Sequence, residues 1–110
     1  MDTLEEIKDR LSEEPETVTV LRAFLGDEDQ RLEYDRLENY LKDIPGTVDE
    51  DEIRSTVHTL QANRLLSLED SAVETYSLTG IGEAYLEELY GDDLEELRGN
   101  MLFYFDTRNI

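Results

Sequence analysis

The chain has 110 residues, the usual length of a single domain, and a formal net charge of -19 from 29 acidic and 10 basic side chains. It contains no cysteine, which excludes disulfides and thiolate metal sites. No apolar run approaches the ~20 residues of a membrane helix, and the acidic first residues lack a signal-peptide pattern, so we expect no membrane partner and a cytoplasmic location.

The acidic side chains are distributed along the whole chain. Periodically spaced Leu, Ile and Val lie between them, and 38% of the residues are hydrophobic, so the chain can build a core that the acids coat. Such a coat is compatible with imitation of nucleic acid and with adaptation to molar salt, where the Debye length is about 3 Å and carboxylate repulsion is screened. Only Lys8 and Lys42 are lysines. This scarcity resembles proteins of halophilic archaea, and we favour adaptation to salt.

Apolar residues at helical spacing predict four helices in the first two thirds of the chain. Their expected ranges are 3–12, 15–25, 30–43 and 49–64. Thr3 and Glu6 form a capping-box pair at the start of the first helix, and Pro15 suits the first turn of the second. Pro45 and Gly46 are expected to end the third helix.

Two short strands and a last helix follow. The pattern predicts strands at 65–69 and 73–78, joined by a hairpin loop at 70–72. The last helix is expected from about residue 79 to residue 90, directly after the second strand.

The C-terminal segment is harder to assign. Gly91 is expected to break the helix, and a continuation through Leu97 is expected to end at Gly99 and Asn100. The tail at 101–105 is apolar on both faces, which is compatible with a strand or with a docking segment.

The predicted fold is mainly α with a small β-hairpin. Three helices followed by a hairpin are typical of the winged helix-turn-helix, here with an additional helix at each end. We expect one domain over residues 1–110. It would comprise an N-terminal helix within 1–14, a winged-helix core at 15–78, and a C-terminal helix and tail at 79–110 that can serve dimerisation.

Residues 76–86 read Tyr-Ser-Leu-Thr-Gly-Ile-Gly-Glu-Ala-Tyr-Leu. This segment resembles the Y-x-L-T-x-x-G-x-x-Y-L junction of many prokaryotic winged-helix transcription regulators, the PadR and MarR types among them. In that pattern the second wing strand ends at the Leu-Thr pair and the closing helix begins at once. Residues 20–25 and 60–66 are similar to the first helix of these families and to the exit from their recognition helix. The resemblance extends over roughly residues 17–90 and implies a dimeric regulator of transcription that binds double-stranded DNA.

The resemblance implies that the fourth helix, at 49–64, is the recognition helix that enters the major groove. Arg54 is suited to a bidentate contact with guanine and Gln61 to a contact with adenine, whereas Ser55 and Thr59 suit phosphates. Any exposed helix displays such side chains, so a purely structural role is the alternative for each of them. The side chains expected to contact DNA are Arg54, Ser55, His58, Thr59, Gln61, Arg64, Arg22, Arg31 and Arg36.

Two features oppose ordinary DNA binding. The predicted recognition helix begins with four consecutive acids at 49–52, which repel phosphates, and the predicted wing at 67–74 has no basic residue. Both support an alternative hypothesis, in which a winged-helix domain acts as an adaptor or a DNA mimic and binds a basic protein. The hypotheses differ because only the regulator predicts sequence-specific DNA binding that survives molar potassium chloride.

Large apolar side chains gather toward the C-terminus and predict a homodimer interface. Its expected residues are Tyr85, Leu89, Leu94, Leu97, Met101, Phe103 and Phe105. The alternative is that these side chains close the core of their own chain against the first helix.

Motifs of catalysis or cofactor binding are not found in the sequence. It lacks the nucleophile elbow, the phosphate-binding loop and the zinc-protease helix. The Asp pairs at 27 and 29 and at 49 and 51 lack the glycine and the later ligands of an EF-hand. His58, the only histidine, is expected to be a surface group. We therefore expect no enzymatic activity, no metal and no cofactor.

Overall fold

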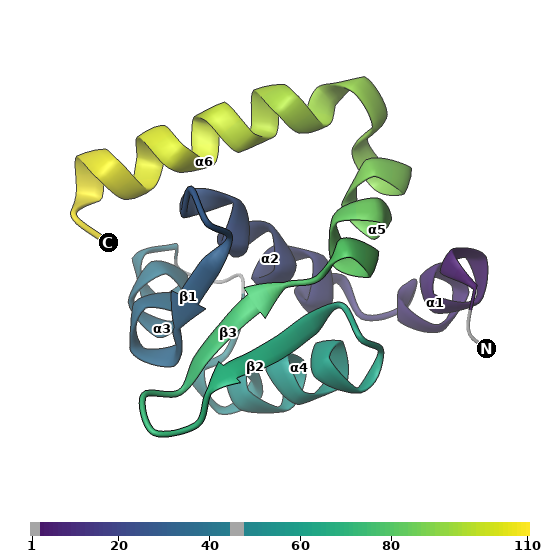
Figure 1. The fold of residues 1–110 in the computed structure, drawn as a ribbon, viewed down its shortest axis with the longest axis horizontal. Helices are drawn as coiled ribbons and strands as arrows, with labels where there is room; N and C mark the ends of the chain where they lie inside the picture. The colour runs from purple at the N-terminus through teal and green to yellow at the C-terminus, as the bar shows by residue number, and fades with distance from the viewer. Residues whose placement is uncertain (1–2, 45–47) are drawn as a thin grey trace.

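The fold consists of helices arranged around a small antiparallel sheet (Figure 1). The computed structural model describes residues 3–44 and 48–110. The helices are α1 (Leu4–Leu11), α2 (Pro15–Ala23), η1 (Phe24–Gly26), α3 (Tyr34–Asp43), α4 (Glu50–Ala62), α5 (Gly80–Tyr90), η2 (Gly91–Asp93) and α6 (Leu94–Arg108). The strands are β1 (Arg31–Glu33), β2 (Leu66–Asp70) and β3 (Thr75–Leu78). The predicted class, mainly α with a small β part, is confirmed.

Short polar side chains and a proline determine where several helices begin. Thr3 Oγ1 accepts the N–H of Glu6 at 3.2 Å, as predicted for the start of α1. Thr79 caps α5 in the same way, with the N–H of Gly82 at 2.9 Å. Pro15 lies at the start of α2, where its missing N–H costs no hydrogen bond. Each cap satisfies an N–H group that has no partner within its own helix.

The segment before α3 differs from the prediction. The sequence predicts a helix from about residue 30, but the structure forms the strand β1 there and begins α3 at Tyr34. Gln30 has a φ of 58°, a left-handed conformation that a helix does not contain. Asp27 Oδ2 accepts the N–H groups of Asp29 and Arg31 at 3.0 and 3.2 Å, and so shapes the turn into the strand. Three residues are too few for an alternating pattern to be recognised.

The sheet has the order β1-β3-β2, and both strand pairs are antiparallel. Tyr76 of the central strand β3 pairs with Leu32 of β1 and with Leu68 of β2. Asp70 Oδ1 accepts two N–H groups of the loop that joins β2 to β3, which stabilises its turn. The predicted hairpin is therefore confirmed, and β1 is the strand that the sequence pattern missed.

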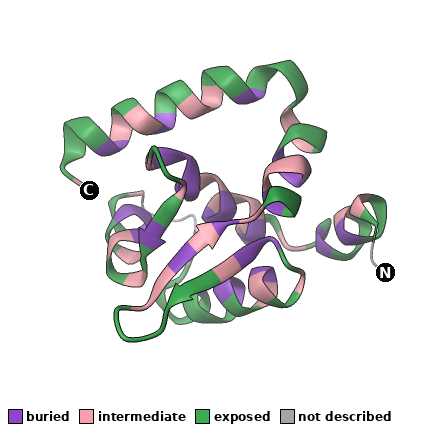
Figure 2. Ribbon diagram, in the orientation of Figure 1, coloured by how far each residue is buried: buried purple, intermediate pink, exposed green. Residues whose placement is uncertain are grey.

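The core lies between the inner faces of α2, α4 and the sheet (Figure 2). Val20 and Leu21 of α2 and Ile53, Val57 and Leu60 of α4 are all at most 1% exposed. The last three follow the helical spacing of one face, which confirms the apolar face predicted for the fourth helix. The opposite face of α4 is left to the surface.

The C-terminal segment is helical almost to its end, so the predicted helix end at Gly99 and Asn100 is wrong, as is the strand alternative for the tail at 101–105. α6 continues through Gly99 and Asn100, and the predicted tail at 101–105 belongs to this helix, the long one in Figure 1. Phe105 is 2% exposed and packs against Gly26 of η1, where an added Cβ would lie 2.4 Å from its ring. This burial outweighs the low helix propensity of a single glycine.

The other predicted helix ends have separate outcomes. Gly91 has a φ of 56° and separates α5 from α6, as predicted. α3 ends at Asp43. Pro45 and Gly46, which are predicted to end this helix, lie outside the described residues.

Candidate nucleic-acid interface

The outer face of α4 is the surface where the sequence predicts contacts with DNA bases. Its exposed residues are Asp51, Arg54, Ser55, His58 and Ala62. They lie on the side of α4 away from its buried residues Ile53, Val57 and Leu60. The β2–β3 hairpin follows α4 in the chain (Figure 1), and its first strand packs against α4.

The acidic coat of the chain is interrupted along this helix. The sequence has no Asp or Glu between Glu52 and Glu69, and the next longest such interval is 17–26. The first turn of α4 is acidic, while its later turns are neutral or positive. The surface of α4 thus has an acidic end and an acid-free remainder. This signal can be read in the sequence, but a search for periodicity and basic residues overlooks it.

Arg54 makes contacts that the sequence does not predict. Its Nη1 donates to both carboxylate oxygens of Glu74, at 3.1 Å to Oε1 and 3.0 Å to Oε2. Its guanidinium carbon lies 4.3 Å from the centre of the Tyr34 ring. The hydrogen bond that Arg54 donates to Glu74 raises the pKa of the guanidinium, which is therefore charged at neutral pH. The side chain is still 52% exposed, and Arg54 joins α4 to the hairpin and to α3.

Glu74 and Tyr34 are the residues of this cluster that sequence reasoning missed. The carbonyl of Glu74 accepts the N–H of Tyr34 at 2.8 Å, and its carboxylate accepts the hydroxyl of Tyr76 at 3.4 Å. Burial raises the pKa of both tyrosines, so both hydroxyls are protonated at neutral pH. The partners lie about 20 residues from Arg54 on either side, too far for a local motif to reveal them.

The other predicted contacts on α4 have different surroundings. Ser55 Oγ donates to the carbonyl of Glu52, and Thr59 Oγ1 donates to the carbonyl of Ser55, both at 3.0 Å. Both hydroxyl protons are therefore bonded to backbone carbonyls of α4, whereas the hydroxyl oxygens can still accept a hydrogen bond from a ligand. His58 is exposed and Gln61 is half-buried.

Arg64 lies just beyond the end of α4, where the chain turns toward the hairpin. Its φ is 64°, and its carbonyl accepts the hydroxyl of Thr79 at 2.6 Å. The side chain is exposed. Of the predicted contacts outside α4, Arg64 therefore lies nearest to it in the chain, and its side chain is open to solvent.

Arg22 and Arg31 lie on other elements. Arg22 of α2 is half-buried, with its guanidinium carbon 5.9 Å from the centre of the Tyr90 ring of α5. It lines an apolar groove of about 480 Å³ together with Leu89. Arg31 is exposed on β1, beside Asp27. Arg22 therefore lies against α5, and Arg31 lies beside the turn before β1. Neither is on α4, where the residues predicted to contact bases lie.

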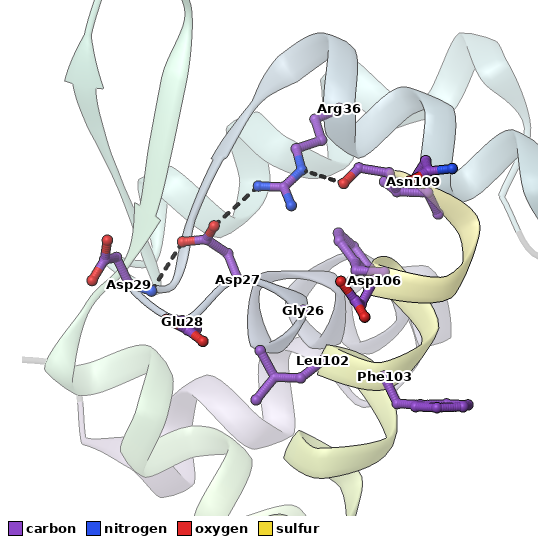
Figure 3. A pocket seen from close by; sticks show the side chains of 11 residues that line it. Gly26, Asp27, Glu28, Asp29, Arg36, Leu102, Phe103, Asp106 and Asn109 are labelled. Carbon is purple, nitrogen blue, oxygen red and sulfur yellow. Dashed lines mark hydrogen bonds and ion pairs between the residues drawn. The ribbon is translucent and has the colours of Figure 1, made fainter.

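Arg36 is bound at the C-terminal end of α6 (Figure 3). Its Nε donates to the carbonyl of Ile110 at 2.9 Å, and its Nη1 to Asp27 at 3.0 Å. The guanidinium also lies over the ring of Phe105, 5.5 Å from its centre. A hollow of about 810 Å³ lies beside this cluster, with Asp106 on its rim. These contacts give Arg36 a structural role that the sequence does not predict.

The residues of the predicted dimer interface divide into three groups. Tyr85, Leu94, Met101 and Phe105 are at most 6% exposed and belong to the core of their own chain. Leu89 and Leu97 are half-buried. Phe103 of α6 is 70% exposed. The structure thus leaves Phe103 as the main apolar side chain of this set that a second copy could cover.

Comparisons with known proteins add no assignment for this chain. We found no family model, no curated protein and no solved structure that matches it. Within residues 3–44 and 48–110, no helix is long and apolar enough to cross a membrane. In the same residues, no three or more His, Asp or Glu side chains lie close enough to hold a metal ion.

Proposed function

We propose that the chain is a sequence-specific DNA-binding protein with a winged helix-turn-helix fold. In this proposal α3 and α4 form the helix-turn-helix, α4 enters the major groove, and the β2–β3 hairpin is the wing. The element order α2-β1-α3-α4-β2-β3 and the strand order β1-β3-β2 support this assignment, because both are typical of winged helices. The protein acts as a homodimeric transcription regulator in a salt-rich cytoplasm.

The observation that carries the proposal is the acid-free interval on α4. Acids occupy exposed positions throughout the rest of the chain, where they hold water at high salt. Each acid on a surface that approaches phosphates weakens binding, because like charges repel. Between Glu52 and Glu69 the exposed positions instead carry Arg, Ser, His, Ala and Leu side chains, none of which repels a phosphate.

Base contacts must supply most of the affinity in such a protein. Counterion release contributes little when the surrounding salt is molar, so a strongly basic surface would gain little. α4 has 13 residues, a length of about 20 Å at 1.5 Å per residue. This is enough to present the outer face along a major groove about 12 Å wide.

The test is selection from a random library of DNA duplexes in about 2 M potassium chloride, where carboxylate repulsion is strongly screened. We expect a recurrent motif with two-fold symmetry and half-sites spaced by about one helical turn, 34 Å. A double variant, Ser55→Glu with His58→Glu, restores acids to the outer face and is expected to weaken binding by about tenfold or more.

A matched control makes the same change in net charge elsewhere. Arg10→Gln with Ser12→Glu alters exposed positions at the end of α1, outside α4 and α6, and is expected to leave DNA binding unchanged. Recovery of DNA no better than from empty beads would contradict the proposal, as would equal binding by the α4 double variant.

One observation favours a second candidate function. The first turn of α4 is acidic, and the hairpin carries Glu69, Asp70 and Glu74 without any basic residue. A basic protein would complement this surface, and the chain would then be an adaptor or a DNA mimic. In this case DNA is not bound at any salt concentration, and basic protein partners bind less tightly to a variant with Glu50→Gln and Glu69→Gln.

A further inference from the structure

The cluster around Arg54 suggests how α4 distinguishes bases from phosphates, an inference that rests on the proposed DNA binding. Glu74 accepts hydrogen bonds from only one nitrogen of the guanidinium, Nη1. The other edge, formed by Nε and Nη2, makes no hydrogen bond or ion pair within the described part of the chain. This edge carries two parallel N–H donors, the arrangement that pairs with O6 and N7 of guanine.

The ring of Tyr34 fixes the plane of this free edge. The guanidinium carbon lies 4.3 Å from the ring centre, a distance typical of stacking between a cation and an aromatic face. The backbone of Tyr34 is in turn hydrogen-bonded to Glu74. The same two residues therefore hold the guanidinium on two sides, and less rotational freedom is lost when a base is bound.

The carboxylate of Glu74 also changes what Arg54 can attract. A free guanidinium carries a full positive charge and binds any phosphate, whatever the sequence. The pair of Arg54 and Glu74 has no net charge, yet it keeps two directed donors. Arg64 provides the contrast, because it is exposed and no ion pair is found for it within the described residues.

We propose that Glu74 and Tyr34 are positioning residues that present the Nε and Nη2 edge of Arg54 to a guanine and withhold its charge from phosphates. Arg54 is the residue that touches the base, and Glu74 sets the specificity of that contact from the hairpin. The acidic hairpin, which opposes ordinary phosphate binding, thereby contributes to sequence discrimination.

The test compares the binding of Glu74→Gln and of the unaltered protein to the selected motif and to motifs with one base pair changed. Arg54→Ala first identifies the G·C pair that Arg54 reads, as the position where the preference disappears. We expect Glu74→Gln to lower the discrimination at that pair by about tenfold. We also expect log K against log [KCl] to become steeper by about one unit, because the released guanidinium contacts a phosphate.

Two further variants separate position from charge. Tyr34→Leu removes the stacking surface but keeps the ion pair, so it is expected to reduce discrimination without changing the salt slope. Glu69→Gln removes one charge from the same hairpin, at a residue that bonds Ser77 rather than Arg54, and is expected to change neither quantity. Reversible unfolding of each variant in the same salt verifies that it is folded.

The outcomes distinguish this inference from the proposed function. If no motif is selected by the unaltered protein, both fail. If a motif is selected but Glu74→Gln keeps the guanine preference and the salt slope, the inference fails and the proposed function stands. Equal effects of Glu74→Gln and Glu69→Gln also overturn it, because they would show a general effect of charge.

Discussion

Two junctions of the molecule each combine an arginine, a carboxylate and an aromatic ring. They differ in which N–H donors of the arginine remain without a hydrogen bond. At the C-terminal junction, Arg36 pairs with Asp27 and lies over Phe105, and its Nε also binds the carbonyl of Ile110. At the α4 junction, Arg54 pairs with a carboxylate and lies over an aromatic ring, but it uses only Nη1. The first arginine uses both Nε and Nη1 in the fold, whereas the second uses Nη1 alone.

The comparison shows that the partners of an arginine do not by themselves define its role. Both ion pairs are partly exposed, so neither contributes much to stability through charge alone. In our proposal, the N–H donors that remain unbonded distinguish Arg54, which would contact a base, from the structural Arg36. Variants at the two junctions test this distinction, and the largest effect is expected on stability.

The largest effect is expected at the ring beneath Arg36. Phe105→Ala removes a side chain that is 2% exposed and leaves a cavity against Gly26, so we expect a loss of about 3–5 kcal/mol in the free energy of unfolding. Denaturant titration in molar potassium chloride measures it. The matched control is Phe103→Ala, two residues earlier and 70% exposed, which should cost less than about 0.5 kcal/mol. Similar losses for both variants would mean that α6 is not anchored through Phe105.

An intermediate effect is expected from the arginines themselves. Arg36→Met should lower the free energy of unfolding by roughly 1 kcal/mol, because two hydrogen bonds to α6 and to the turn are lost. It should leave the base preference of the DNA complex unchanged. Arg54→Met should change the unfolding midpoint less than Arg36→Met does, but it should remove the preference for guanine at one position of the motif. The distinction between the junctions fails if Arg36→Met alters sequence preference, or if Arg54→Met does not.

The smallest effect is expected on the pH dependence of stability. The ring under Arg54 is Tyr34, which can ionise, whereas the ring under Arg36 is Phe105, which cannot. Burial raises the pKa of Tyr34 above its ordinary value of 10.0, although Arg54 opposes the shift. Below pH 10 the hydroxyl is protonated in the folded and unfolded states, and above it the unfolded chain loses the proton more readily. Stability must therefore fall as the pH rises through this range.

Tyr34→Phe keeps the ring and removes this titration. Unfolding midpoints at about pH 8 and pH 11 should differ less in the variant than in the unaltered protein. The remaining buried tyrosines, for example Tyr85, still contribute their own loss of stability. A pH dependence identical in the two proteins would show that the hydroxyl of Tyr34 is as free as in the unfolded chain.

The sequence predicts the part of the fold that depends on local periodicity. The apolar face of α4 follows from Ile53, Val57 and Leu60, and the hairpin follows from two short apolar segments around a polar loop. β1 could not be predicted in this way, because three residues give no period and the strand depends on the side chain of Asp27. The length of α6 also depends on a distant contact, that of Phe105 with η1.

The candidate site was predictable in its location but not in its organisation. Arg54, Ser55 and His58 are on the exposed face of α4, as their spacing indicates. Nothing near Arg54 in the sequence identifies Glu74 or Tyr34, because a carboxylate on a hairpin and a ring on another helix meet it only in the folded chain. The acid-free interval was available in the sequence and needed only a count of acids along the chain.

The turn held by Asp27 has a consequence for any attempt to redesign the protein for dilute buffers. Such a redesign would replace acids with neutral residues, and composition treats all 29 of them alike. Asp27 accepts two backbone N–H groups and a guanidinium, so its replacement would release β1 and the end of α6 together. Exposed acids such as Glu87 and Asp92 can be exchanged first, whereas Asp27 belongs with the core residues in any list of positions to keep.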